Sequence, residues 1–328
     1  MAAYIDIIRW KNLLFIAFIQ WLITHTVVAP ILQTYDFDTL HYTFWGYWLI
    51  VATVLISAGG YVINDYYDVK IDRINKPNKI IVSEKISKKS AMLYYQLLTG
   101  LGVACGIILS LFVRSISLGF IFVLTPGLLW FYSASYKRQF LVGNLVVALL
   151  SSATIFVAGL LAVALLKTEY NELIYQTTIP TILYGWTGGF AFFAFTATWI
   201  REIIKDIEDE KGDREMECRT MVIKWGTQKT KLFLYGLILL VILSLFFVNY
   251  RFVYFEGTFT LRYLFFGLIL PYIALSYSIF KAKVSADFHQ ASTFSKFIML
   301  AGILYSLVFY YLQAKMYNLN FFGLFIIQ

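Results

Sequence analysis

The sequence is poor in charged residues and has few cysteines and histidines. Charged residues make up only 14% of the 328 positions, against about a quarter in a soluble domain, while 60% are hydrophobic. Water cannot be the solvent for most of such a chain. The two cysteines, Cys105 and Cys218, form neither a disulfide framework nor a metal cluster. The three histidines, His25, His41 and His289, lie away from the acidic motifs, so we expect structural roles for them and no Ser-His or Cys-His catalysis.

The hydrophobic residues form blocks long enough to cross a bilayer, which takes roughly 20 helical residues. We therefore predict an all-α integral membrane protein of about nine transmembrane helices in a single domain, residues 1–328. No small-residue cleavage site follows the first block, so we expect it to stay in the protein. The predicted spans are 13–32, 44–63, 92–112, 118–135, 141–165, 179–200, 232–249, 261–280 and 294–314.

The net charge of +8 is explained by membrane orientation. If the N-terminus is cytoplasmic, 22 of the 27 Lys and Arg fall in segments on that side. The positive-inside rule expects this asymmetry, so nucleic-acid binding is not needed to explain it. We expect a multi-pass protein of the plasma (inner) membrane whose N-terminus and polar loops face the cytoplasm. The five remaining basic residues are Arg114, Lys167, Arg251, Arg262 and Lys315.

Two acidic motifs follow the second and the sixth predicted spans, and so lie on the same side of the membrane. In the first motif, 64–72, Asn64, Asp68 and Asp72 recur every four residues, and Asp65 lies beside them. If the helix continues past the membrane edge, this spacing places them on one face. In the second motif, 202–213, the spacing predicts one helical stripe. Its members are Glu202, Asp206, Asp209 and Asp213.

Carboxylates held close together repel one another unless cations neutralise them. Mg²⁺ takes oxygen ligands and is commonly held by one or two carboxylates together with phosphate oxygens of a substrate. We therefore predict that the two motifs bind a diphosphate through Mg²⁺. The expected metal ligands are Asp65, Asp68, Asp72, Glu202, Asp206, Asp209 and Asp213.

Basic residues stand among these acids. A site that only bound metal ions would not need them. Arg and Lys are the side chains that bind phosphate oxygens. We expect Lys137, Arg201 and Lys205 to be catalytic, because they stand beside the motifs and would neutralise a departing diphosphate.

With these motifs the sequence resembles the UbiA-type intramembrane prenyltransferase superfamily. Its signature N-D-x-x-D-x-x-x-D matches residues 64–72, and its Y-x-x-x-x-K-R and G-N segments match 132–138 and 143–144. The second motif, with Arg219-Thr220 after it, resembles most closely the branch that makes archaeal-type ether lipids, in which geranylgeranyl diphosphate alkylates geranylgeranylglyceryl phosphate. The resemblance implies diphosphate binding by Arg9, Asn64, Lys79, Tyr132, Arg138, Asn144 and Arg219.

The resemblance also implies helices around a central cavity that the acidic motifs cap, open to lipid for the isoprenoid tail. Glycines just before the motifs are expected to allow close helix approach. These glycines are Gly59, Gly60, Gly185, Gly188 and Gly189.

Other functions are weaker readings of the same residues. A transporter would carry its acids near the bilayer midplane, whereas these lie at the ends of spans. A phosphotransferase acting on CDP-activated alcohols would need D-x-x-D-G, but Val69 and Lys70 follow Asp68. Within the superfamily, the acceptor stays open between geranylgeranylglyceryl phosphate, an aromatic quinone precursor and a tetrapyrrole.

Overall fold

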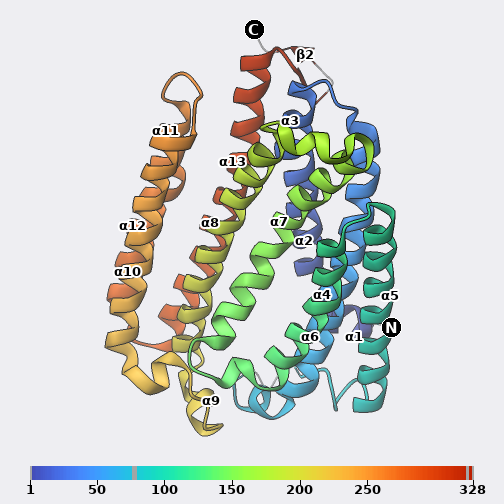
Figure 1. Cartoon of the computed structure of the whole chain (residues 1–328). Helices are drawn as coiled ribbons and strands as arrows, with labels where there is room; N and C mark the ends of the chain where they lie inside the picture. Colours follow the sequence, from blue (N-terminus) through green and yellow to red (C-terminus); the bar gives the residue numbers. More distant parts are fainter. Residues whose placement is uncertain (1, 76–79, 323–324, 327–328) are drawn as a thin grey trace. The chain divides into compact units, whose positions relative to one another are not determined.

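The structure is a computed structural model that describes residues 2–75, 80–322 and 325–326 (Figure 1). Nearly all of these residues are helical, as the hydrophobic blocks predict. In chain order the elements are α1 (Ala2–Ile7), α2 (Trp10–Ile23), the π-helical turn η1 (Thr24–Val28), α3 (Ala29–Thr34), α4 (Thr39–Asn75), α5 (Lys88–Phe112), α6 (Ile116–Ala134), η3 (Tyr136–Arg138), α7 (Val142–Tyr170), η4 (Asn171–Gln176), α8 (Ile179–Glu208), α9 (Glu210–Glu215), α10 (Met221–Phe252), α11 (Phe259–Tyr263), the π-helical turn η5 (Leu264–Ile269), α12 (Leu270–Lys281), α13 (Ser285–Tyr317), β1 (Asn320–Phe321) and β2 (Phe325–Ile326).

Within the described residues, eight helical segments are long and apolar enough to cross a membrane. They overlap eight of the nine predicted spans. The ninth, 179–200, forms most of helix α8, but α8 is not among the eight. Glycine, threonine and tryptophan interrupt its apolar residues, which lowers its mean hydropathy. The predicted count of nine is therefore not confirmed, although the helix itself is present.

Polar caps and prolines explain where several helices begin and change pitch. Ser87 caps α5, where its hydroxyl accepts a hydrogen bond from the backbone N–H of Ser90 over 3.1 Å. Ser115 caps α6 in the same way. The π-helical turns η1 and η5 each precede a proline, Pro30 and Pro271, in the first turn of the next helix. Proline lacks an N–H donor, so the usual helical hydrogen bond cannot form there.

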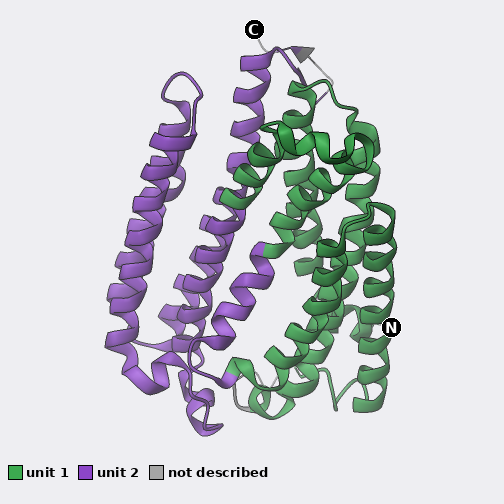
Figure 2. Cartoon of the chain, viewed as in Figure 1, with its two compact units in different colours: residues 1–137, 153–189 green, residues 138–152, 190–328 purple. Residues whose placement is uncertain are grey.

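The chain divides into two compact units, and each is described by itself (Figure 2). Unit 1 comprises residues 1–137 and 153–189. Unit 2 comprises residues 138–152 and 190–328.

In unit 1, α4 packs against α2, α5 and α6. The close approach requires glycine: a Cβ on Gly59 would lie 2.2 Å from Oγ1 of Thr99, and one on Gly60 would lie 3.0 Å from Leu129. The prediction of close helix approach is thus confirmed at these two positions. It is wrong at Gly185 and Gly189, where nothing lies within 4 Å.

In unit 2, a buried core joins α8, α10, α12 and α13. It contains Ile203 and Ile204 of α8, Leu234 of α10, Leu275 of α12 and Ala291 of α13, all fully buried. This core holds the end of α8, which carries the second acidic motif, against the first turns of α13. The strands β1 and β2 form a short antiparallel hairpin.

Candidate active site

The first acidic cluster lies on the last turns of α4, in unit 1. As predicted, the helix continues through the motif, since α4 ends only at Asn75. The amide Nδ2 of Asn64 donates to Oδ2 of Asp68 over 2.8 Å. The ammonium group of Lys137 donates to the other oxygen of the same carboxylate. Three of the predicted site residues therefore meet at Asp68.

Arg9 joins this cluster from the N-terminal segment. Its guanidinium Nη2 lies 2.6 Å from Oδ1 of Asp65, and the group stacks over the ring of Tyr61 at 5.2 Å. The charge of Asp72 also acts on Arg9. Arg9 adopts a left-handed backbone with φ of 52° between α1 and α2, which turns the chain at this point. The structure therefore brings Arg9 to the first motif, as the resemblance implied.

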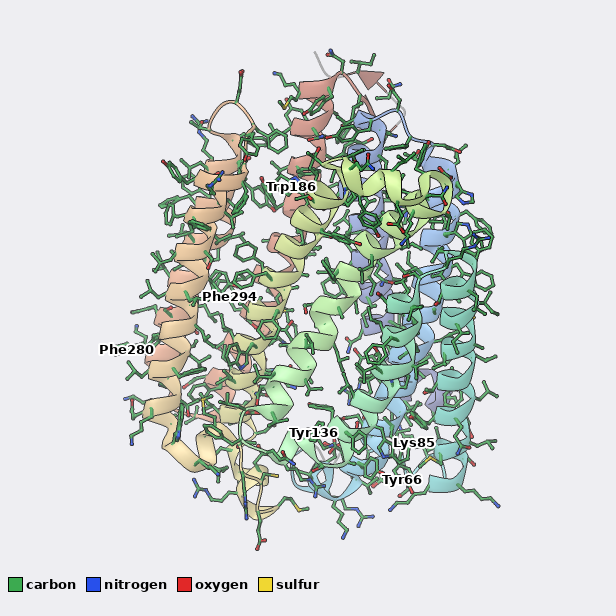
Figure 3. All side chains as sticks on the ribbon, viewed as in Figure 1. Tyr66, Lys85, Tyr136, Trp186, Phe280 and Phe294 are labelled. Atoms are coloured by element: carbon green, nitrogen blue, oxygen red, sulfur yellow. The ribbon has the colours of Figure 1, made fainter. Side chains whose placement is uncertain are left out.

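Tyr132 lies in the last turn of α6, partly buried, a few residues before Lys137. In Figure 3, Tyr66, Lys85 and Tyr136 mark the same end of unit 1, and Trp186 lies toward the other end. Lys79, a predicted diphosphate ligand, lies outside the described residues.

The second acidic cluster lies at the end of α8, in unit 2. Glu202 is buried and accepts two charged donors: Nη1 of Arg201 at 2.7 Å and Nζ of Lys205 at 3.3 Å. Charge-assisted bonds of this kind are stronger than neutral ones. Both predicted catalytic cations of this motif thus share one carboxylate.

Asp206 accepts a hydrogen bond from Nδ2 of Asn144, at the start of α7, over 2.9 Å. Asp206 stands beyond the apolar stretch that ends at residue 200. The pKa of Asp206 is raised to about 8, mainly by burial and also by the nearby carboxylates Asp213 and Glu202, against the opposing effects of the hydrogen bond from Asn144 and the charge of Lys205. A cation beside these three carboxylates would relieve their mutual repulsion.

The predicted continuous stripe of the second motif is wrong beyond Glu208. Helix α8 ends there, Asp209 takes non-helical dihedrals, and Asp213 lies on the separate short helix α9. Asp213 is nevertheless buried and within electrostatic reach of Asp206. The turn between α8 and α9, and not a continuous helical stripe, therefore brings Asp213 close to Asp206.

A backbone hydrogen bond joins two further predicted phosphate ligands, Arg138 and Arg219. The N–H of Arg219 donates to the carbonyl oxygen of Arg138 over 2.7 Å. The Nε of Arg138 is buried without a hydrogen-bond partner among the described residues. A buried donor of this kind costs free energy unless a partner arrives, which favours an anion as its ligand.

The prediction that the histidines lie away from the motifs is wrong for His289. Its Nδ1 lies 2.7 Å from Oε1 of Glu208, at the end of the second motif. Lys296, seven residues after His289 on α13, was not among the predicted site residues. The charges of Arg201 and Lys205 act on it. The signal available in the sequence was an ionisable residue inside an apolar span, which marks a functional position by default.

The residues of both clusters fit Mg²⁺, given the way proteins hold that ion. Among residues 2–75, 80–322 and 325–326, no three His, Cys, Asp or Glu side chains lie close enough to hold a metal by themselves. Mg²⁺ is commonly bound by only one or two carboxylates, with phosphate oxygens and water completing its shell. Asp65 and Asp68 lie within electrostatic reach of each other, as do Asp206 and Glu202.

Known proteins resemble this chain over most of its length. The model of the UbiA prenyltransferase family matches residues 22–304. A curated relative, digeranylgeranylglyceryl phosphate synthase of Methanosphaera stadtmanae, is 32% identical over 305 residues, which cover 92% of this chain and 96% of the relative.

Two solved structures have the same fold. One, described as giving structural and mechanistic insights into the biosynthesis of digeranylgeranylglyceryl phosphate synthase in membranes, matches with a TM-score of 0.61 and 22% identity and covers 94% of this chain and 98% of that one. The other is a UbiA homologue from Archaeoglobus fulgidus bound to GPP and Mg²⁺, with a TM-score of 0.55, 13% identity and coverage of 93% and 99%. The solved structures show the fold, and the sequence matches show the family: this protein belongs to the UbiA prenyltransferase family.

Proposed function

We propose that this protein transfers a geranylgeranyl group from geranylgeranyl diphosphate to geranylgeranylglyceryl phosphate, in a reaction that requires Mg²⁺. The observation that supports this most is that each acidic cluster holds a carboxylate directly bonded to a predicted catalytic cation, Asp68 to Lys137 and Glu202 to Arg201 and Lys205. The name of the Methanosphaera relative supports the acceptor, and the Archaeoglobus homologue supports the diphosphate and the ion.

We propose that both clusters serve one diphosphate in a single prenyltransferase domain. Asp68 and Asp206, with Asp65, Asp72, Glu202, Asp209 and Asp213, would hold Mg²⁺. When bound, the ion would offset the negative charge of the diphosphate oxygens.

The chain's own cations perform the rest of the electrostatic work. Without substrate, the cations Lys137, Arg201 and Lys205 form ion pairs with carboxylates. When a diphosphate binds, its oxygens become acceptors for the N–H donors of the same cations. Their N–H donors then match the charge that grows on the leaving diphosphate as the allylic C–O bond breaks and its electron pair departs. A hydroxyl oxygen of the acceptor bonds to C1 of the prenyl chain, and its proton passes to the departing diphosphate or to water. No covalent bond to the protein is needed.

The experiment that tests this function is a product analysis. Purified protein is incubated with labelled geranylgeranyl diphosphate and a panel of acceptors, with Mg²⁺ or with EDTA. We expect a labelled digeranylgeranylglyceryl phosphate that disappears with EDTA and returns with Mg²⁺. A prenylated aromatic product instead would show that the acceptor is a quinone precursor, and undiminished turnover in EDTA would overturn the Mg²⁺ mechanism.

The eight apolar helices and the family membership make this a multi-pass integral membrane protein. We further propose that it lies in the plasma membrane, that α8 also crosses, and that the N-terminus and both acidic motifs face the cytoplasm. The Lys and Arg distribution supports this orientation, and the 30 residues of α8 span about 45 Å at 1.5 Å per residue.

Cysteine labelling decides between eight and nine crossings. Introduced at Lys88 and at Lys211, cysteines should react from the same side, in a background from which Cys105 and Cys218 have been removed. If α8 does not cross, the two positions label from opposite sides.

A further inference from the structure

The end of α8 and the start of α13 are tied together in unit 2. The hydroxyl of Ser285 donates to the carbonyl oxygen of Glu208 over 2.9 Å, and Nδ1 of His289 lies 2.7 Å from its carboxylate. The two helices run alongside each other from this point (Figure 1). Because α8 ends here and α13 begins here, their chains run in opposite directions.

This antiparallel register places Lys296 at the level of Arg201. Lys296 lies seven residues after His289 on α13, and Arg201 lies seven residues before Glu208 on α8, so each stands two helical turns from the tie. Both helices contribute to one buried core, with Ile204 from α8 and Ile298 from α13. The charges of Arg201 and Lys205, and the opposite charges of Glu208 and Glu202, all act on the ammonium group of Lys296.

Three cations, Arg201, Lys205 and Lys296, interact here with two carboxylates, Glu202 and Glu208. Glu202 is already shared by Arg201 and Lys205, and Glu208 is engaged by His289. Among the described residues Lys296 forms no ion pair, and Nε of Arg201 is buried without a hydrogen-bond partner. A lysine on an apolar helix, beside two other cations, destabilises the folded protein unless an anion binds to it.

We propose that Lys296, beside the Arg201 that serves the diphosphate, binds the phosphate group of the lipid acceptor. This inference rests on the proposed function, because it explains how the enzyme would prefer a phosphorylated lipid to an uncharged aromatic acceptor. Lys296 projects from an exposed position, and the next residue, Phe297, is exposed as well. An ammonium group beside an apolar side chain suits a ligand with a phosphate at one end and a hydrocarbon chain at the other.

The test is steady-state kinetics of Lys296→Gln, Lys296→Arg and wild type in nanodiscs of uncharged lipid. Geranylgeranylglyceryl phosphate and geranylgeranyl diphosphate are varied in turn. We expect Lys296→Gln to raise the KM for the acceptor about tenfold or more, while the KM for the diphosphate changes by less than about twofold. Lys296→Arg keeps the charge and should restore most of the acceptor affinity. Lys283→Gln, a lysine in the loop before α13, is the matched control and should leave both constants unchanged.

Three outcomes overturn the inference. A raised KM for the diphosphate assigns Lys296 to the donor; unchanged constants show that it binds no substrate; and an effect that appears only after anionic lipid is added assigns it to membrane headgroups. If Lys296→Gln does not fold, Lys296→Met replaces it: a raised KM for the acceptor alone supports the inference, and any other pattern overturns it. A wild type that prenylates only aromatic acceptors would refute the proposed function itself, which is a separate result.

Discussion

The side-chain amide of Asn144 donates to the carboxylate of Asp206 over 2.9 Å, joining residues 62 positions apart. Asn144 lies in the first turn of helix α7, and Asp206 lies in the last turn of α8. The carboxylates Glu202 and Asp213 also act electrostatically on Asp206. Asp206 is thus oriented by a neutral donor, which adds no positive charge where a metal ion would bind.

Replacing this carboxylate should slow the reaction strongly while the protein still folds. We expect Asp206→Asn to lower kcat about 10²- to 10³-fold, the usual cost of losing one electrostatic contact to a transition state. Asp68→Asn should have a similar effect, because Asp68 is the meeting point of the first cluster. Rates are measured on protein whose folding is verified by thermal unfolding.

The control is Glu172→Gln. Glu172 lies in η4 with its side chain 76% exposed and bonded to Lys167, so its change should alter the rate by less than about twofold. If the folded Asp206 and Asp68 variants keep normal turnover while Glu172→Gln does not, the site assignment is wrong.

Lys137 should act through its charge and through Asp68. Lys137→Gln removes the cation and leaves Asp68 without its ion pair, so we expect a loss of roughly 10²-fold in kcat/KM for the diphosphate. Lys137→Arg should retain more activity, since the charge is kept. In a double-mutant cycle with Asp68→Asn the losses should not add, because the two groups share one contact. Additive losses would mean that the two residues work independently.

The raised pKa of Asp206 predicts how Mg²⁺ activation depends on pH. Because that pKa is about 8 in the metal-free protein, Asp206 is mostly protonated at pH 6, and Mg²⁺ must displace the proton to bind. The Mg²⁺ concentration for half-maximal activity should therefore fall as pH rises from 6 to 8 and level off above 8. A pH-independent requirement would exclude Asp206 as a ligand.

The same shift predicts the stability of the metal-free protein. An ordinary Asp has a pKa of 3.8, so between about pH 4 and pH 8 the unfolded chain has released a proton that folded Asp206 retains. Folding stability therefore falls as pH rises through this range, and the loss is complete above pH 8. Asp206→Asn lacks this loss, so in EDTA its advantage in Tm over wild type should be larger at pH 9 than at pH 5. An equal advantage at both pH values would contradict the raised pKa.

Two glycines of unit 1 offer a matched test of helix packing. A Cβ on Gly106 of α5 would lie 2.2 Å from Cγ of Phe122 on α6, whereas one on Gly127 of α6 meets nothing within 4 Å. Gly106→Ala should therefore destabilise the protein by about 1–3 kcal/mol, and Gly127→Ala should stabilise it by roughly 0.5–1 kcal/mol through its higher helix propensity. Thermal unfolding in one detergent compares them. Equal Tm values would mean that α5 and α6 are not packed as closely as described.

Much of the fold could be predicted from the sequence because its causes are local. Apolar blocks of about 20 residues leave the backbone no alternative to helix in a bilayer, and eight predicted spans are helices of spanning length and composition. The four-residue spacing of Asn64, Asp68 and Asp72 also sufficed, since α4 continues through all three. Residue types at helical spacing therefore predicted both the architecture and the first acidic face.

Only the tertiary structure decided which groups meet. Lys137 and Asp68 are 69 residues apart, and His289 and Glu208 are 81 apart. No periodicity reaches across such distances, because these pairs depend on which helices pack together and in what register. The break at Asp209 escaped prediction for a related reason: the sequence continues the helical spacing of acids, but a backbone turn places Asp213 on α9. The sequence alone determined that this chain has two carboxylate clusters suited to a divalent cation, and helix packing decided which cation, amide and histidine each carboxylate contacts.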